Sequence, residues 1–179
     1  CIRDSNRTSE RLAALSTNFS NHVLDATQQW NLVIHERDQL RGVPERALDI
    51  LAAAAAEAGD TAADGSASSA AHGPWRLGLD MPRYLPVITH AQDRALRETL
   101  YKAHVSRASS GDLDNAPLIE EILQLRREQA VRLGYSNWAE LSLASKMADD
   151  VPAVETLLEE LRSSATVSYT HLTLPTKNE

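Results

Sequence analysis

Apolar residues recur along this chain mainly at the three-to-four spacing of helical faces. The first such face lies between residues 10 and 38 and predicts a long amphipathic helix. It is formed by Leu12, Leu15, Phe19, Val23, Ala26 and Trp30. Trp30, Leu32 and Ile34 also alternate with their neighbours, so a short strand can begin there; we expect the helix to end before Trp30.

Turn residues divide the next part of the chain. Gly42 to Pro44 interrupts the pattern, and Pro44 at a first helical position predicts a second helix through the alanines to Ala58. Residues 59–73 carry no periodic apolar face and predict a flexible loop. Trp75, Leu77 and Leu79 then alternate as in a half-buried strand, which we expect to pair with a strand at residues 30–34.

The remaining residues alternate helical faces with helix breakers. Pro82 and Pro86 indicate an irregular link. Four helices are expected after it: residues 93–109, a helix opened at Asn115 and closed at Gly134, a shorter helix capped by Ser136 or Asn137, and residues 152–161. The pattern therefore predicts a mainly α, multi-helix domain with a small β-hairpin.

The two ends of the chain differ from this pattern. The sequence starts at Cys1, and residues 1–9 have no apolar stretch of signal-peptide length, so we expect a truncated start. Residues 166–179 are rich in threonine and unlike the rest, and they are typical of a translated cloning or adaptor tail. The alternative is a short native strand of β-branched residues. The helical domain is accordingly expected to span residues 10–165.

Composition narrows the functional class. The formal charge is −7, and 25 acidic residues oppose 18 basic ones, which argues against a nucleic-acid surface. The chain is too polar for a membrane protein. Cys1 is the only cysteine, so no intrachain disulfide can form and a secreted disulfide scaffold is excluded.

A search for catalytic motifs identifies no site. The histidines are far apart in sequence, and no His-Glu-x-x-His zinc motif occurs. They are His22, His35, His72, His90, His104 and His171. His104 is the most interesting, because it shares a predicted helix with Tyr101 and Arg107 and can face a cleft. The sequence contains no Gly-x-Ser-x-Gly elbow and no phosphate-binding glycine loop. The acid pairs at 120–121 and 159–160 are expected to be solvated helix surface.

Several ordered blocks resemble the oligopeptidase A and thimet oligopeptidase family of zinc metallopeptidases. They are residues 15–26 (LSTNFSNHVLDA), 73–87 (GPWRLGLDMPRYLPV), 97–111 (RETLYKAHVSRASSG), 114–130 (DNAPLIEEILQLRREQA), 133–135 (LGY) and 139–148 (AELSLASKMA). The similarity covers about residues 10–162. Matched blocks in the right order are more specific than any single motif.

The resemblance implies a larger, two-halved helical metallopeptidase fold around a deep channel that admits short peptides. This chain is expected to be an incomplete piece from the N-terminal half. Zn²⁺ belongs to the full-length enzyme, whose ligands lie on a later helix. No catalytic, cofactor-binding or metal residue is therefore assigned here, and this chain alone is expected to be inactive and zinc-free.

The resemblance also implies partners and a location. Short peptides are the expected substrates of the full-length enzyme, with no nucleic acid or membrane partner, and the expected compartment is cytoplasmic or organellar. Large aromatics are expected to be scaffold rather than substrate contacts. They are Trp75, Tyr84, Tyr101 and Trp138. Arg97 and Arg107 either line the channel or pair with nearby acids. The alternative function is a non-catalytic helical module that binds peptides or partners.

Overall fold

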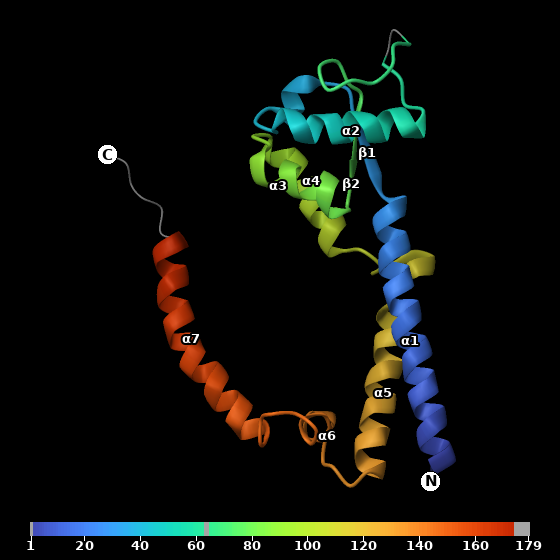
Figure 1. The fold of residues 1–179 in the computed structure, drawn as a ribbon, viewed down its shortest axis with the longest axis vertical. Helices are drawn as coiled ribbons and strands as arrows, with labels where there is room; N and C mark the ends of the chain where they lie inside the picture. Colours follow the sequence, from blue (N-terminus) through green and yellow to red (C-terminus); the bar gives the residue numbers. More distant parts are fainter. Residues whose placement is uncertain (1, 63–64, 174–179) are drawn as a thin grey trace. The chain divides into compact units, whose positions relative to one another are not determined.

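The computed structural model describes residues 2–62 and 65–173 and is mainly helical (Figure 1). Its elements are α1 (Ile2–Gln29), β1 (Asn31–Ile34), η1 (Arg37–Leu40), α2 (Glu45–Ala58), β2 (Trp75–Gly78), α3 (Met81–His90), α4 (Arg94–Val105), η2 (Gly111–Leu113), α5 (Ala116–Arg132), α6 (Trp138–Leu143) and α7 (Val151–Thr173). The chain divides into two compact units, one of residues 13–119 and one of residues 1–12 with 120–179. The predicted mainly α class is confirmed.

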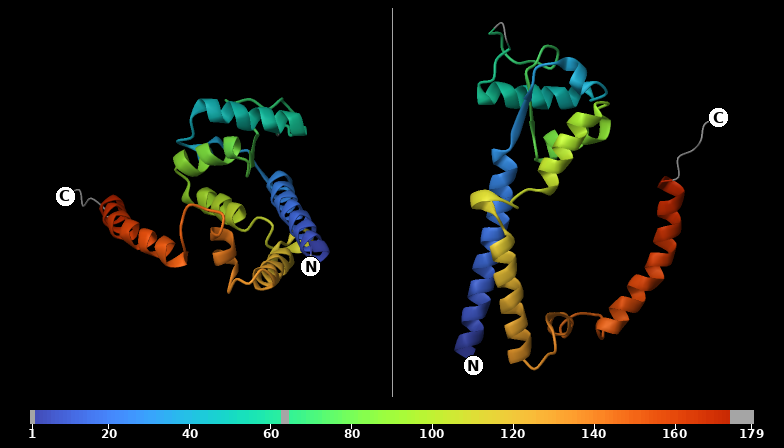
Figure 2. Two further views of the ribbon diagram at one scale, coloured as in Figure 1. Left: turned by 60° about the horizontal axis from the view of Figure 1, so that its bottom comes forward. Right: turned by 180° about the vertical axis from the view of Figure 1, so that it is seen from behind.

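The predicted hairpin forms in the 13–119 unit. β1 and β2 are antiparallel, with Leu32 opposite Leu77 and Ile34 opposite Trp75. α2 and α3 both contact β2, and α3 also contacts α4, an arrangement that both views of Figure 2 show. Buried apolar side chains from all these elements join in one core. Its fully buried members are Leu40, Leu48, Leu51, Trp75, Leu77, Leu79, Val87 and Leu100.

α2 begins and ends at the expected signals. Pro44 is the extended residue before the helix rather than its first residue, and Gly59 ends it with φ of +81°. A left-handed residue at this position is most easily a glycine, because it has no Cβ. The buried face of α2 consists of Ala47, Leu48, Leu51, Ala52 and Ala55.

The prediction of an irregular link around Pro82 and Pro86 is wrong, because both prolines lie in α3. Pro82 is in the first turn, where no backbone N–H is needed. Pro86 lies inside the helix and removes one hydrogen bond of the ladder. The burial of Tyr84 and Val87 against the core offsets this loss.

α4 is shorter than predicted. Asp93 caps it by accepting hydrogen bonds from the amides of Ala95 and Leu96 at 2.8 and 3.2 Å. The helix ends at Val105 rather than Ser109. Beyond it, Ala108 has a φ of +50°, in the left-handed region, and its carbonyl accepts from the Asn115 amide at 2.9 Å. This turn directs the chain away from the helix axis.

The 59–73 segment is tied to the hairpin in the part that the structure describes. Arg76 of β2 donates two hydrogen bonds to the Asp60 carboxylate, at 2.7 and 2.9 Å. Thr61 bridges Ala67, and Ser69 bridges Gly73. Its predicted flexibility stays a prediction.

The second unit contains the start of α1, most of α5, and α6 and α7. α1 already begins at Ile2, before the predicted boundary at residue 10. Asn137 caps α6 by accepting from the Glu140 amide at 3.0 Å, as expected. Among the described residues of α5, Ala130 alone is buried. Leu133 is 51% exposed.

α7 differs most from the sequence pattern. It continues through the predicted tail to Thr173, so residues 166–173 are helical and neither loop nor strand. Residues 174–179 lie outside the described residues. Whether the 166–179 segment is native stays a prediction.

Candidate functional site

The side chain of His104 contacts an aromatic ring rather than a catalytic partner. Its imidazole stacks on Tyr84 with 4.2 Å between ring centroids and 19° between the planes. Burial, and to a smaller extent the positive charge of Arg107, lowers the pKa of His104 below its usual value. The ring is therefore held neutral at pH 7, as part of the packing between α3 and α4.

Arg107 lies just past the end of α4 and is half-buried. Its Nη1 donates a long hydrogen bond of 3.4 Å to Thr27 Oγ1. Its Nε is buried and has no hydrogen-bond partner. In the described part of the chain no acidic group forms an ion pair with it, so the expected pairing of Arg107 with a nearby acid is not found.

Arg107 is one of the residues that line a hollow of about 530 Å³, which we call the Arg107 pocket. The residues that form it come from the end of α1, the end of β2, the last turn of α4 and the η2 segment. They are Ala26, Gln29, Trp30, Leu79, Ala103, Ser106, Arg107, Ala108, Ser110, Gly111, Asp112 and Leu113. All of them belong to the 13–119 unit.

A buried polar contact near this region escaped the sequence analysis. The Asn115 side chain is 3% exposed and reaches α1 instead of capping α5. Its Oδ1 lies 2.9 Å from His22 Nδ1, and its Nδ2 donates to the Phe19 carbonyl at 3.1 Å. Because an amide oxygen only accepts, His22 Nδ1 carries the proton. Asp114 takes the capping role, accepting from the Ala116 amide at 3.0 Å.

The other residues singled out in the sequence differ in their partners and in their burial. Arg97 donates to the carbonyl of Ala91 rather than to an acid. Trp75 and Tyr84 are buried in the core, as expected, whereas Tyr101 is 56% exposed and is not core. Trp138 is half-buried beneath Arg126, whose guanidinium carbon lies 5.3 Å from the ring centroid.

The acid pairs are surface groups, with one stronger contact than expected. Glu121 accepts two hydrogen bonds from Arg11, at 2.6 and 2.7 Å. These bonds lower the pKa of Glu121 and raise the pKa of Arg11. Glu159 pairs with Arg162 at 2.5 Å. One carboxylate of each pair, Glu121 and Glu159, is therefore committed to an arginine.

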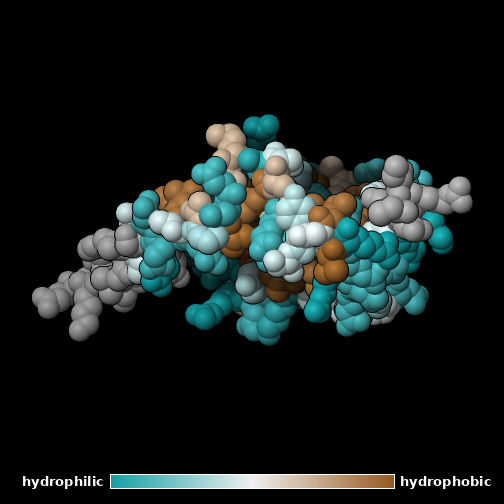
Figure 3. All heavy atoms as spheres, turned by 90° about the horizontal axis from the view of Figure 1, so that it is seen from below, coloured by the Kyte–Doolittle hydropathy of each residue, from teal (hydrophilic) through white to brown (hydrophobic). Residues whose placement is uncertain are grey.

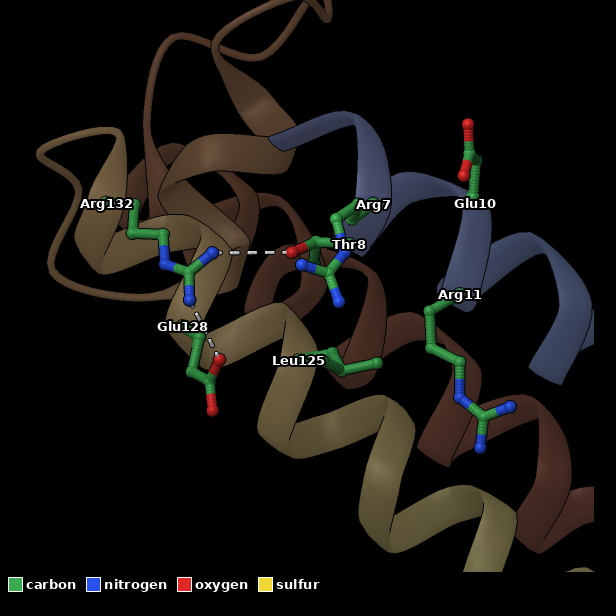
Figure 4. Close-up of a pocket in the computed structure, with 7 residues that line it drawn as sticks. All are labelled: Arg7, Thr8, Glu10, Arg11, Leu125, Glu128 and Arg132. Carbon is green, nitrogen blue, oxygen red and sulfur yellow. Dashed lines mark hydrogen bonds and ion pairs between the residues drawn. The ribbon is translucent and has the colours of Figure 1, made fainter. Parts of the chain in front are cut away.

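A second hollow, of about 570 Å³, lies between α1 and α5 in the other unit (Figure 4). It is lined by Arg7, Thr8, Glu10, Arg11, Leu125, Glu128 and Arg132. Arg132 reaches Glu128 and Thr8, each at 3.4 Å. Its arginines and glutamates largely balance, so this hollow has no distinct chemistry.

The described residues do not fit a metal centre. No group of three His, Cys, Asp or Glu side chains within residues 2–62 and 65–173 is arranged to hold a metal ion. Nor does any helix in that part of the chain combine the length and apolar character needed to cross a bilayer. We derive no step through zinc from these residues.

Comparison with known proteins identifies the family. The model of peptidase family M3 matches residues 87–174, which include part of the 166–179 segment. An organellar oligopeptidase A of Arabidopsis thaliana is 48% identical over 160 residues, covering 89% of this chain and 20% of that protein. Oligopeptidase A of Escherichia coli is 41% identical over 160 residues, covering 87% of this chain and 22% of that protein.

These similarities cover almost all of the chain but little of its relatives. The chain spans about a fifth of the length of the curated relatives it matches. The resemblance inferred from the ordered sequence blocks is confirmed. The chain belongs to peptidase family M3, with the oligopeptidases A as relatives.

Proposed function

We propose that this chain is a segment of a zinc metallo-oligopeptidase that hydrolyses short peptides, and that it contributes substrate-channel scaffold without catalytic residues. The observation that carries the proposal is the 48% identity to an oligopeptidase A over 160 residues. The sequence contains no His-Glu-x-x-His, which supports a zinc site in another part of the enzyme.

The contacts of the candidate residues support a scaffold role. The two histidines with described side-chain partners are occupied structurally: His104 stacks on Tyr84, and His22 bonds Asn115. A general base needs a lone pair within reach of a substrate proton. Glu121, the best-ordered acid of its pair, is held by Arg11. No nucleophile and base combination occurs among these groups.

The names of the relatives suggest where the full-length enzyme acts. They include an organellar, a cytosolic and a bacterial oligopeptidase A. We propose a cytoplasmic or organellar compartment and short peptides as substrates. Nucleic acids and membranes are not proposed as partners, because the net charge of −7 opposes phosphate binding.

The experiment is to express the longest reading frame that contains this segment and to assay a quenched fluorescent peptide. We expect cleavage that a zinc chelator abolishes and that added Zn²⁺ restores, with no cleavage of a folded protein of similar composition. A reading frame without His-Glu-x-x-His would contradict the enzyme assignment, as would cleavage that the chelator does not affect. In either case the non-catalytic binding module would become the better account.

A further inference from the structure

We propose that Arg107 is the cation of a carboxylate-binding site in the Arg107 pocket. The guanidinium has five N–H donors, and among the described residues it forms one hydrogen bond, the long 3.4 Å contact to Thr27 Oγ1. Its Nε is buried without a partner. The guanidinium therefore has N–H donors that no described residue satisfies, and Arg107 lines the pocket.

The neighbouring groups in the pocket leave the guanidinium available. Thr27 donates its hydroxyl proton to the Val23 carbonyl at 2.7 Å, and the contact that its oxygen accepts from Arg107 is long, at 3.4 Å. Asp112 lines the same hollow but forms no ion pair with Arg107 within the described residues. Burial and the charge of Arg107 lower the pKa of His104, and a neutral imidazole provides no negative charge to pair with the guanidinium.

The backbone holds Arg107 in place. It lies between the end of α4 and Ala108, whose φ of +50° is rare for alanine. The hydrogen bond from the Asn115 amide to the Ala108 carbonyl, at 2.9 Å, fixes this turn. A guanidinium presented by a fixed turn loses little freedom when it binds a ligand.

The charge and size of the pocket favour a carboxylate. One arginine matches a singly charged carboxylate in a two-bond geometry, whereas a phosphate dianion usually requires several cations. Asp112, which also lines the pocket, opposes a higher negative charge. The volume of about 530 Å³ accepts a residue or two of a peptide. Trp30 and Leu79 provide apolar wall, and Ser106 and Ser110 provide hydroxyls.

The carboxylate can come from two sources. One is the free C-terminus of a short peptide, a source that rests on the proposed function. The other is an acidic side chain from a part of the protein outside residues 1–179. Both place the same chemical group against Arg107, and a binding experiment distinguishes them.

The test follows the Nε–H resonance of Arg107 by NMR in the ¹⁵N-labelled 179-residue chain. The probes are N-acetyl-Gly-Gly with a free carboxylate and the same peptide with a C-terminal amide. We expect a saturable shift of this resonance with the carboxylate and none with the amide. Arg107→Gln should abolish the response of the Trp30 indole N–H, whereas Arg94→Gln, at an exposed arginine on α4, should preserve it.

The same titration on the longer enzyme separates the sources. A carboxylate-dependent shift there identifies the peptide C-terminus. An internal acid is identified by two results together. The carboxylate shifts the resonance in the 179-residue chain but not in the longer enzyme, and Arg107→Gln lowers the melting temperature of the longer enzyme. No carboxylate-dependent shift in either form would overturn the proposal, as would equal shifts with the amide. None of these readouts requires peptide cleavage. Failure of the carboxylate site and failure of the proposed function can therefore be distinguished.

Discussion

The imidazole of His104 lies against the phenol ring of Tyr84, and Arg107 acts on it as a nearby charge rather than as a hydrogen-bond partner. Burial disfavours the protonated ring, and so does the guanidinium. The folded state therefore keeps this histidine neutral to a lower pH than the unfolded chain does. The stability that this preference provides is present above the unfolded pKa of about 6.5 and is lost as the pH falls through the folded pKa.

We predict that Arg107→Gln raises the pKa of His104, because the variant removes the repulsive charge and leaves the burial unchanged. Arg94→Gln, which is exposed at the start of the same helix, should leave that pKa unchanged. The measurement is an NMR titration of the His104 ring proton between about pH 4 and pH 8, a range that includes the usual histidine pKa of about 6.5. A pKa that does not move in Arg107→Gln would show that the charge has no effect on this ring.

The second residue-scale prediction concerns Asn115. Asn115→Ala removes the contacts to His22 and Phe19 and leaves both without these partners. We expect the free energy of unfolding to fall by about 1–3 kcal/mol, measured by urea denaturation. Asn21→Ala, at an exposed position on α1, is the matched control and should change it by less than about 0.5 kcal/mol. Equal effects of the two substitutions would contradict the structural role of the buried amide.

At the scale of elements, Asp60 and Arg76 connect the segment after α2 to β2. Both side chains are about one-fifth exposed, at 20% and 21%. The hydrogen bonds from Arg76 are the main reason why the pKa of Asp60 is lowered. A carboxyl with a lowered pKa stabilises the fold above its unfolded pKa of about 3.9, and this contribution disappears as the pH falls through the folded value.

We predict that Asp60→Asn lowers the free energy of unfolding by about 1 kcal/mol at neutral pH. The difference from the parent chain should shrink as the pH falls below about 4, because the parent then loses the same charge. Denaturation curves at a series of pH values measure it, with exposed Asp49→Asn on α2 as the control. A difference that persists undiminished in acid would assign the effect to something other than the ion pair.

Local signals in the sequence predicted some elements and misled about others. The alternation of Trp30, Leu32 and Ile34 and the cap at Asn137 act over a few residues, and the hairpin and α6 follow them. α3 does not, because the burial of its apolar face against the core overrides the proline signals. α7 likewise passes through a threonine-rich stretch with weak helical preference.

The candidate site was harder to predict than the fold. Arg107 and His104 were singled out because they share a predicted helix. The pocket, however, also needs Trp30, Leu79 and Asp112, which are far apart in sequence. Nothing local indicates that they converge. The buried contact from Asn115 to α1 was also not predicted. An asparagine before a helix ordinarily indicates a cap, and nothing in the local sequence indicates a contact with α1.

At the scale of the whole molecule, apolar side chains remain at the surface (Figure 3). On α7, three leucines are each more than half exposed: Leu157, Leu158 and Leu161, at 55%, 59% and 56%. Exposed apolar stripes are typical of surfaces that are covered by another part of a protein or by a partner. This agrees with our proposal that the chain is scaffold within a larger peptidase.

The most direct test of that account is chelator-sensitive cleavage of a quenched fluorescent peptide by the purified 179-residue chain, assayed beside the product of the longer reading frame. We predict that the longer product cleaves the peptide, that a zinc chelator stops it, and that the 179-residue chain cleaves nothing above buffer. Chelator-sensitive cleavage by the 179-residue chain alone, with zinc bound in proportion to protein, would contradict the assignment of this segment as non-catalytic.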